Sequence, residues 1–250
     1  MKLEIIGIEG LPEFEPGSDI AELVSEGAAQ AGTPLRRGDV VVITQKIVSK
    51  AEGRLVRLSD VTPSSFAVAW GTAHRCDPRL IELILSESRR IVRMERGILI
   101  AETHHGFVCA NAGVDLSNVA GGEVAALLPK DADASARRIR EGLIARTGAP
   151  VAVVVSDTFG RPWREGLVNV AIGVAGMSPL ASYVDARDPA GFELKATVQA
   201  LADEIAAACG LVARKLNRIP AVVVRGLSYD GADDGSTRAL IRPAERDLFR

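Results

Sequence analysis

Three short runs of β-branched residues constrain the fold of this chain more than any other feature. They read DVVVIT at residues 39–44, PVAVVVSD at 150–157 and IPAVVVRG at 219–226. Branching at Cβ stiffens a side chain and favours the extended backbone over the helix, so each run predicts a β-strand. The run at 150–157 is apolar on successive residues, which predicts a strand buried inside the molecule.

Helical patterns separate these runs without a regular alternation. Helices are expected at residues 18–30, from 77 onward, at 133–146, at 192–215 and, briefly, at 243–249. Asp77 followed by Pro78 is a good helix start. The Asp77 carboxylate can cap the first backbone amides, and the φ angle of Pro78 is already fixed near the helical value. The segments RIVRM, ILIAE and GFVCA have the spacing of antiparallel hairpins, and KLEIIGI at the N-terminus is a further strand. The sequence therefore predicts an α+β fold with mixed or antiparallel sheets and packed helices.

Length and charge bound the class of protein. The chain has 250 residues, 47% hydrophobic and 25% charged, enough for one large domain or for two lobes that meet near residues 121–134. Its 30 basic and 32 acidic residues give a net charge of −2. This balance gives no general attraction to nucleic acid or to an anionic membrane, although a local basic patch is compatible with it. We therefore expect neither as a partner.

The cysteines and the N-terminus favour a cytoplasmic protein. Cys76, Cys109 and Cys209 lie far apart and form no CxxC pair, so neither a disulfide framework nor a zinc knuckle is indicated. The first ten residues hold an apolar run too short for a secretion signal, and no later run approaches a membrane span. A soluble, cytoplasmic protein is expected.

The stretch SDTFGRPWREG gathers polar side chains directly after the buried strand. Asp157 and Thr158 offer the hard oxygen ligands that suit Mg²⁺ or Mn²⁺ beside phosphates. Arg161 and Arg164 add guanidinium groups for an anion, and Trp163 adds a stacking face. The alternative for the acid and the hydroxyl is a local turn bonded to nearby backbone. The arginines and the tryptophan favour a ligand site.

A second polar set lies in NAGVDLSN, which contains Asn111, Asp115 and Asn118. Asp115 and Asp157 are candidates for two carboxylates on one divalent ion, a hypothesis that depends on how the chain folds. The alternative is a loop built from Asx turns.

A third set follows the first Val-rich run, at the expected polar end of that strand. It consists of Gln45, Lys46 and Lys50. The ammonium groups of the two lysines suit phosphate, and the alternative is that both lysines are simply solvated. Arg225 closes the third run and is expected to contact either a phosphate or a carboxylate. The chain has no GxxxxGK[ST] loop, no GxGxxG after a strand and no GxSxG elbow, so a nucleotide enzyme here would use a less common site.

Six blocks in chain order carry a family resemblance: EGLP, VSKAEGR, CANAGVDLSN, SDTFGRPWREG, VAIGVAG and IPAVVVRGL. Together they span nearly the whole chain and resemble the coenzyme F-420:L-glutamate ligases, the gamma-glutamyl ligases of the deazaflavin coenzyme. The resemblance implies an intertwined homodimer that uses GTP to convert a carboxylate of the F-420 precursor into an acyl phosphate. The amine of L-glutamate then attacks it, leaving an amide, GDP and phosphate.

The resemblance also implies roles by position. Mg²⁺ or Mn²⁺ would be held by Asp115, Asp157 and Thr158, with K⁺ as a further candidate cation. GTP would be bound by Leu11, Pro12, Gln45, Lys46, Lys50 and Asn118, and the expected catalytic residues are Asp157 and Lys50. That Arg161 and Arg164 grasp an anionic substrate group, and that Trp163 stacks on the deazaflavin, are hypotheses from side-chain chemistry.

One departure from the family pattern precedes the third Val-rich run. Relatives carry a glycine-rich loop there, whereas residues 212–218 read VARKLNR. Bulky side chains hinder close approach of backbone to phosphate, and Arg214, Lys215 and Arg218 offer charge in its place. Two alternatives follow, a ligase with altered nucleotide or amino-acid preference and a non-catalytic deazaflavin-binding protein. Some relatives continue past the position of Arg250 into a flavin-binding domain of nitroreductase type.

Overall fold

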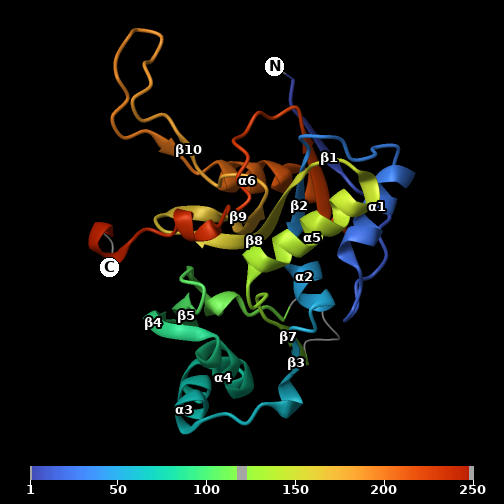
Figure 1. Ribbon diagram of the computed structural model, residues 1–250. Helices are drawn as coiled ribbons and strands as arrows, with labels where there is room; N and C mark the ends of the chain where they lie inside the picture. Colours follow the sequence, from blue (N-terminus) through green and yellow to red (C-terminus); the bar gives the residue numbers. More distant parts are fainter. Residues whose placement is uncertain (1, 117–122, 248–250) are drawn as a thin grey trace.

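A computed structural model describes residues 2–116 and 123–247 (Figure 1). In chain order its elements are β1 (Glu4–Gly7), α1 (Ile20–Gln30), β2 (Val40–Thr44), α2 (Gln45–Ala51), β3 (Leu55–Arg57), η1 (Leu58–Asp60), α3 (Ser65–His74), α4 (Pro78–Ser86), β4 (Ser88–Glu95), β5 (Ile98–Thr103), β6 (Val108–Ala110), η2 (Asn111–Gly113), β7 (Val124–Ala126), α5 (Ala132–Thr147), β8 (Ala152–Arg161), β9 (Arg164–Ala175), β10 (Ala181–Ser182), β11 (Val198–Gln199), α6 (Leu201–Ala213), β12 (Ala221–Arg225), η4 (Thr237–Leu240) and η5 (Ala244–Arg246). The predicted α+β class is confirmed.

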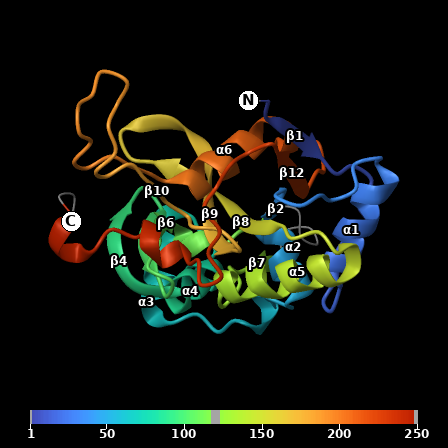
Figure 2. The same ribbon diagram turned by 45° about the horizontal axis from the view of Figure 1, so that its top comes forward.

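The three Val-rich runs form the centre of one sheet. Its strand order is β1-β12-β2-β8-β9, so β12, β2 and β8 have neighbours on both sides. Within this sheet only β2 and β8 pair in parallel, and their pairing ends where Thr44, the last residue of β2, lies opposite Ser156. Each run is apolar on successive residues because both sheet faces are covered, by α1 and α5 on one side and by α6 on the other (Figures 1 and 2).

A second group of elements lies below this sheet in the view of Figure 1. It contains the antiparallel pair β3–β7 and the antiparallel sheet β4-β5-β6, packed with α3 and α4 around a core of its own. The predicted hairpins and the helix start at Asp77 are confirmed, since Asp77 Oδ1 accepts the Arg79 amide at 2.8 Å. The chain enters and leaves this group on β3 and β7, and a division into two lobes near 121–134 stays a prediction, with residues 117–122 outside the described ranges.

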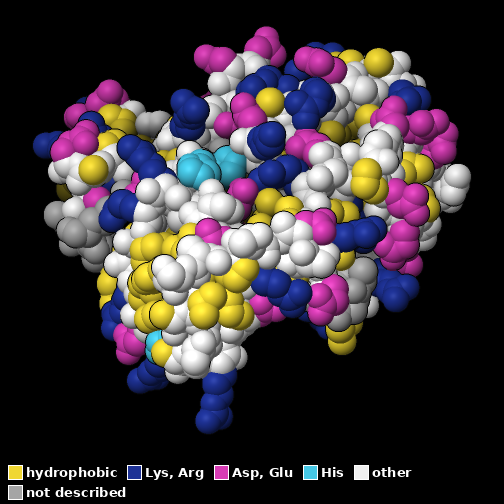
Figure 3. All heavy atoms as spheres, turned by 90° about the horizontal axis from the view of Figure 1, so that it is seen from below, with side chains coloured by type: hydrophobic (Ala, Val, Ile, Leu, Met, Phe, Trp, Pro, Cys, Tyr) yellow, Lys and Arg dark blue, Asp and Glu magenta, His cyan; other side chains and the backbone are white. Residues whose placement is uncertain are grey.

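The surface carries both signs of charge. The face seen from below mixes Lys and Arg with Asp and Glu, and hydrophobic side chains gather on one part of it (Figure 3). None of the helices in the described part of the chain has both the length and the apolar character that crossing a membrane requires.

Residues 45–51 are a helix and not the polar end of a strand. The expectation was wrong because α2 starts directly after Thr44 and directs Ile47 and Val48 into the core. Adjacent side chains of a strand point to opposite faces, whereas in a helix both Ile47 and Val48 reach the same core.

The helix expected at residues 192–215 begins only at Leu201. Residues 192–200 belong instead to a projecting arm, where β11 pairs with β10. The expected C-terminal helix is a single 3₁₀ turn, Ala244–Arg246, with residues 248–250 outside the described ranges. The helix α3, capped by Ser64, was not predicted.

The polar stretch after the buried strand is also extended. β8 continues to Arg161 and returns as β9 from Arg164, so SDTFGR is the outer half of a long hairpin and not a loop. Trp163 lies in the turn with φ of 57°.

Candidate functional site

The parallel pairing of β2 with β8 creates the site. β2 ends at Thr44, opposite Ser156 of β8, so Lys46 at the start of α2 lies beside Asp157, the next residue along β8. This is the carboxyl edge, where the loops of parallel strands commonly hold ligands.

Asp115 reaches this edge from the lower group of elements. It follows the 3₁₀ turn Asn111–Gly113, in which Asn111 and Ala112 have φ of 54° and 51°. Its backbone then pairs with Ala126, with bonds of 3.0 and 2.8 Å in the two directions. These contacts bring its carboxylate to Lys46, whose ammonium lies 2.8 Å from Asp115 Oδ2.

Asp157 has a strongly perturbed carboxyl group. Burial, the largest cause, and the charge of Asp115 together raise its pKa from 3.8 to about 6, although a hydrogen bond from the Thr158 backbone and the charges of Lys46 and Lys215 act in the opposite direction. The structure thus brings together two carboxylates that are 42 positions apart. Burial and the Asp157 charge raise the pKa of the neighbouring Cys109 thiol to about 12. The thiol is therefore protonated and uncharged at neutral pH.

This arrangement suits a divalent cation. The described residues include no group of three or more His, Cys, Asp or Glu side chains that would enclose a metal. Magnesium, however, is usually held by one or two carboxylates together with water and substrate phosphates. Asp115 and Asp157 fit that pattern.

Thr158, the third expected ligand, is committed elsewhere. Alternation along a strand directs its side chain away from the face of Asp157, and its hydroxyl bonds Asn169 Oδ1 at 2.9 Å. Its role at a metal stays a prediction.

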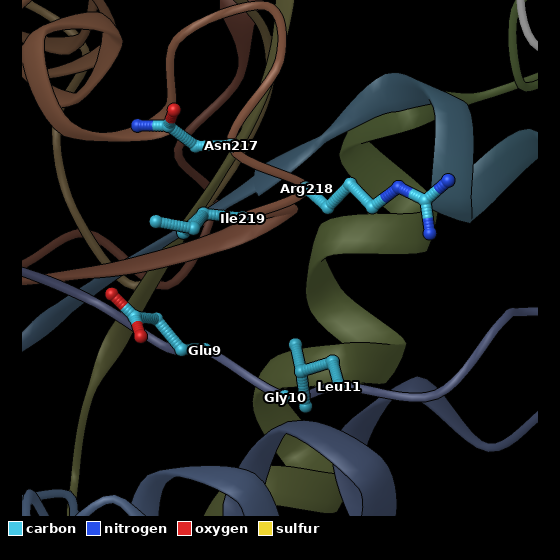
Figure 4. A pocket seen from close by; sticks show the side chains of 6 residues that line it. All are labelled: Glu9, Gly10, Leu11, Asn217, Arg218 and Ile219. Carbon is cyan, nitrogen blue, oxygen red and sulfur yellow. The ribbon is translucent and has the colours of Figure 1, made fainter.

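A second cluster lies beside α2. Lys50 Nζ is 3.1 Å from the Glu13 carboxylate, which ties α2 to the loop containing Leu11 and Pro12. That loop lines an open pocket of about 420 Å³ with Glu9, Gly10, Leu11, Asn217, Arg218 and Ile219 (Figure 4). The glycine-free segment and the EGLP block therefore face one another.

Gln45 is turned into the interior. Its amide nitrogen donates to Ser49 Oγ at 2.7 Å and to Leu127 O at 3.2 Å. These bonds connect α2 to the Leu127 backbone on the interior side of the helix. Asn118 lies outside the described residues.

The tip of the β8–β9 hairpin carries the three expected substrate residues. Arg161 donates to the carbonyl oxygens of Glu165 and Gly166 and so closes the hairpin turn. Trp163 is 80% exposed and Arg164 is also exposed. At about 3.3 Å per residue, Arg161 is roughly 13 Å along the strand from Asp157, so these side chains would meet a remote part of a substrate.

Comparison with known proteins identifies the family. A sequence model described as F420-0:Gamma-glutamyl ligase matches residues 9–226. The chain belongs to this ligase family. A coenzyme F420:L-glutamate ligase of Methanothermobacter thermautotrophicus is 45% identical over the full length of both chains. Proteins of the same name from Methanopyrus kandleri and Methanocaldococcus jannaschii are 43% and 41% identical, covering 99% and 97% of those proteins.

Sequence reasoning missed two residues of this F420-0:gamma-glutamyl ligase family member. Glu13 pairs with Lys50, and Asn169 pairs with Thr158. Both partners are distant in sequence, and neither residue sits in a pattern that predicts a site. Only the fold reveals them.

Proposed function

We propose that the protein joins L-glutamate to the coenzyme F420 precursor in a GTP-driven reaction through an acyl phosphate, with further gamma-linked glutamates added in the same way. Family membership and the names of its relatives support the ligase reaction. The convergence of Asp157 with Asp115 and Lys46 at one sheet edge is the observation that carries the chemistry.

Each group in the site has a task in such a reaction. Asp115 and Asp157 would hold Mg²⁺ or Mn²⁺, which when bound neutralises phosphate charge for phosphoryl transfer. Lys46 and Lys50 offer ammonium groups to phosphate oxygens, and Lys50 would leave Glu13 to do so. The pocket between Leu11 and Arg218 would receive part of the nucleotide, with the guanidinium replacing glycine backbone amides. We also propose a cytoplasmic location, in accord with three free cysteines.

The reaction is tested by incubating the protein with GTP, Mn²⁺, L-glutamate and the unglutamylated coenzyme. We expect a glutamylated coenzyme by mass spectrometry and an equal amount of GDP. Replacing GTP by ATP, and L-glutamate by L-aspartate, separates this ligase from one of altered preference. Tight coenzyme binding with no nucleotide turnover in any of these mixtures would identify a non-catalytic binding protein and contradict the proposal.

We further propose a homodimer, based on the arm between β9 and α6. Its two sides pair at β10–β11 and at the Tyr183–Thr197 and Asp185–Leu194 backbone bonds, both 2.9 Å. The arm projects from the body in both ribbon views (Figures 1 and 2). Phe192 is 72% exposed on it. A lone two-stranded hairpin is marginally stable in water, so a covering surface is expected, and a second copy of the chain supplies one.

Phe192→Asp is expected to convert the dimer into a monomer, because a carboxylate cannot be buried in an apolar contact without a large cost. Light scattering after size-exclusion chromatography measures the mass directly. Lys195→Ser, an exposed change on the same arm, should leave the dimer intact. A wild-type protein that is monomeric at micromolar concentration would refute the proposed assembly.

A further inference from the structure

The edge strand β9 contains an extra residue close to the candidate site. Gly173 pairs with Val155, but the next pair is Ala171 with Ser156, so Ile172 bulges out of the ladder. Bulges of this kind bend a strand and redirect side chains, and they are common beside active sites.

Side chains from other elements bond the outer edge of β9 on each side of this bulge. Asp203 Oδ1, in the first turn of α6, accepts the Ala171 amide at 2.8 Å. Asp133 Oδ1, in the first turn of α5, accepts the Val174 amide at 2.9 Å. Thr237 Oγ1 donates to the bulged Ile172 carbonyl at 3.1 Å. We call this set of three the bulge clamp.

A close backbone contact adds to the clamp. A Cβ on Gly173 would lie 2.3 Å from the Ala132 carbonyl oxygen, so the start of α5 presses directly on the strand. Three backbone groups of this strand edge, the Ala171 and Val174 amides and the Ile172 carbonyl, are thus bonded by side chains of other elements. These bonds are additional to the hydrogen bonds that pair β9 with β8, and an edge strand does not require them in order to pair.

The bulge decides what faces Thr158. With it, Thr158 pairs with Asn169, and their side chains meet at 2.9 Å. A regular ladder continued from the Val155–Gly173 pair would place Val170 opposite Thr158, because one residue of slip exchanges the two faces of a strand. The helix that carries Asp203 also packs on Asn169, since a Cβ on Gly210 would lie 3.2 Å from its Nδ2.

We propose that Asp203 is a positioning residue for the ligase: by holding the Ala171 amide it fixes the bulge, and the bulge fixes the register that places Val170 opposite Asp157 and Asn169 opposite Thr158. This inference rests on the proposed function for its consequence in catalysis. Asp203 contacts no reacting atom and acts through β9.

At position 203 the clamp requires an oxygen that accepts the Ala171 amide, and it does not require a negative charge. Two substitutions of Asp203 separate these two properties. Asp203→Asn keeps an oxygen able to accept the Ala171 amide, whereas Asp203→Ala removes it. Glu204→Ala, exposed in the same turn of α6, controls for charge at the helix start. Two quantities are measured on the whole protein: hydrogen exchange of residues 168–174 without metal, and the Mn²⁺ dissociation constant by titration calorimetry.

We expect Asp203→Ala to exchange faster in residues 168–174 and to bind Mn²⁺ about tenfold more weakly, the usual loss when a ligand's support is removed. Asp203→Asn and Glu204→Ala should stay near wild type in both. Wild-type exchange and affinity in Asp203→Ala, or an equal loss in Asp203→Asn, would overturn the proposal. Thr237→Val, of nearly equal volume, removes another bond of the clamp and gives the same test if Asp203→Ala does not fold. A wild type that binds no Mn²⁺ would contradict the proposed metal site, while the metal-free exchange still tests the clamp.

Discussion

Asp157→Asn is expected to abolish glutamate ligation while making the metal-free protein more stable at pH 7. The amide lacks the negative charge that one of the two carboxylates of the proposed metal site, among the described residues, would supply to a divalent cation. Loss of a group that stabilises transition-state charge typically costs about 10²–10³ in turnover. We therefore expect at least a ~100-fold fall in the rate of GDP formation, with Mn²⁺ binding weakened in parallel.

The gain in stability follows from the raised pKa of Asp157. Its carboxyl has a pKa of about 6 in the folded protein against 3.8 for the ordinary group, because burial disfavours the charged form. The folded state therefore binds the proton more tightly, and this stabilisation is full below about pH 4 and is lost as the pH rises through 6. After allowance for partial solvent exposure, the ionised carboxylate costs about 1–2 kcal/mol at pH 7.

Asparagine resembles the protonated acid and removes this cost. Urea unfolding in EDTA should show the free energy of unfolding of the wild type falling between pH 4 and 7 relative to that of Asp157→Asn. The exposed Asp60→Asn serves as the control and should change neither stability nor turnover. Wild-type turnover in Asp157→Asn would contradict the proposed role of Asp157 at a metal.

The central strands could be predicted from sequence because their signal is local. The side chains of Val40 to Ile43 and of Val153 to Val155 are buried on both faces of the sheet. A run of successive β-branched residues predicts such a strand from the sequence alone. The convergence of Asp115 with Asp157 carries no local signal. It depends on β3 pairing with β7 and on the parallel contact between β2 and β8, neither of which a sequence pattern specifies.

The errors lie where short segments satisfy two patterns. Residues 192–200 continue the helical spacing of α6, but the backbone bonds of the arm outweigh this weak preference. Residues 45–51 directly follow the β-branched run, so their polar side chains were interpreted as the end of that strand, but they form α2. The family resemblance is confirmed, yet only the fold shows that Thr158 faces Asn169 and that Arg161 closes its own turn.

Arg225, expected from the sequence to contact either a phosphate or a carboxylate, pairs with the carboxylate of Asp39. Its Nε and Nη2 donate to the two oxygens of Asp39 at 2.9 and 2.7 Å, and Nη2 also donates to Pro34 O at 2.9 Å. Asp39 is 1% exposed. Asp39 precedes β2, whereas the candidate site follows it, so about 16 Å of strand separates this ion pair from Lys46.

Arg225→Met is therefore expected to lower the free energy of unfolding by about 3–5 kcal/mol, because it leaves the Asp39 carboxylate buried without its cation. The melting temperature should fall by roughly 10 °C for a chain of this size. Calorimetry measures both. Arg37→Met is the control, since Arg37 is exposed and forms no ion pair with residues in the described ranges; its effect should stay within about 0.5 kcal/mol.

A second substitution separates the cost of an unpaired charge from the worth of the pair. Arg225→Met combined with Asp39→Asn removes both charges, and we expect the double variant to be more stable than Arg225→Met alone. The Michaelis constant for GTP, measured well below the melting temperature, should be unchanged in Arg225→Met, because the guanidinium lies at the sheet edge opposite the site. A variant of wild-type stability that loses GTP affinity would assign Arg225 to phosphate, and the nucleotide would then have to span both edges of the sheet.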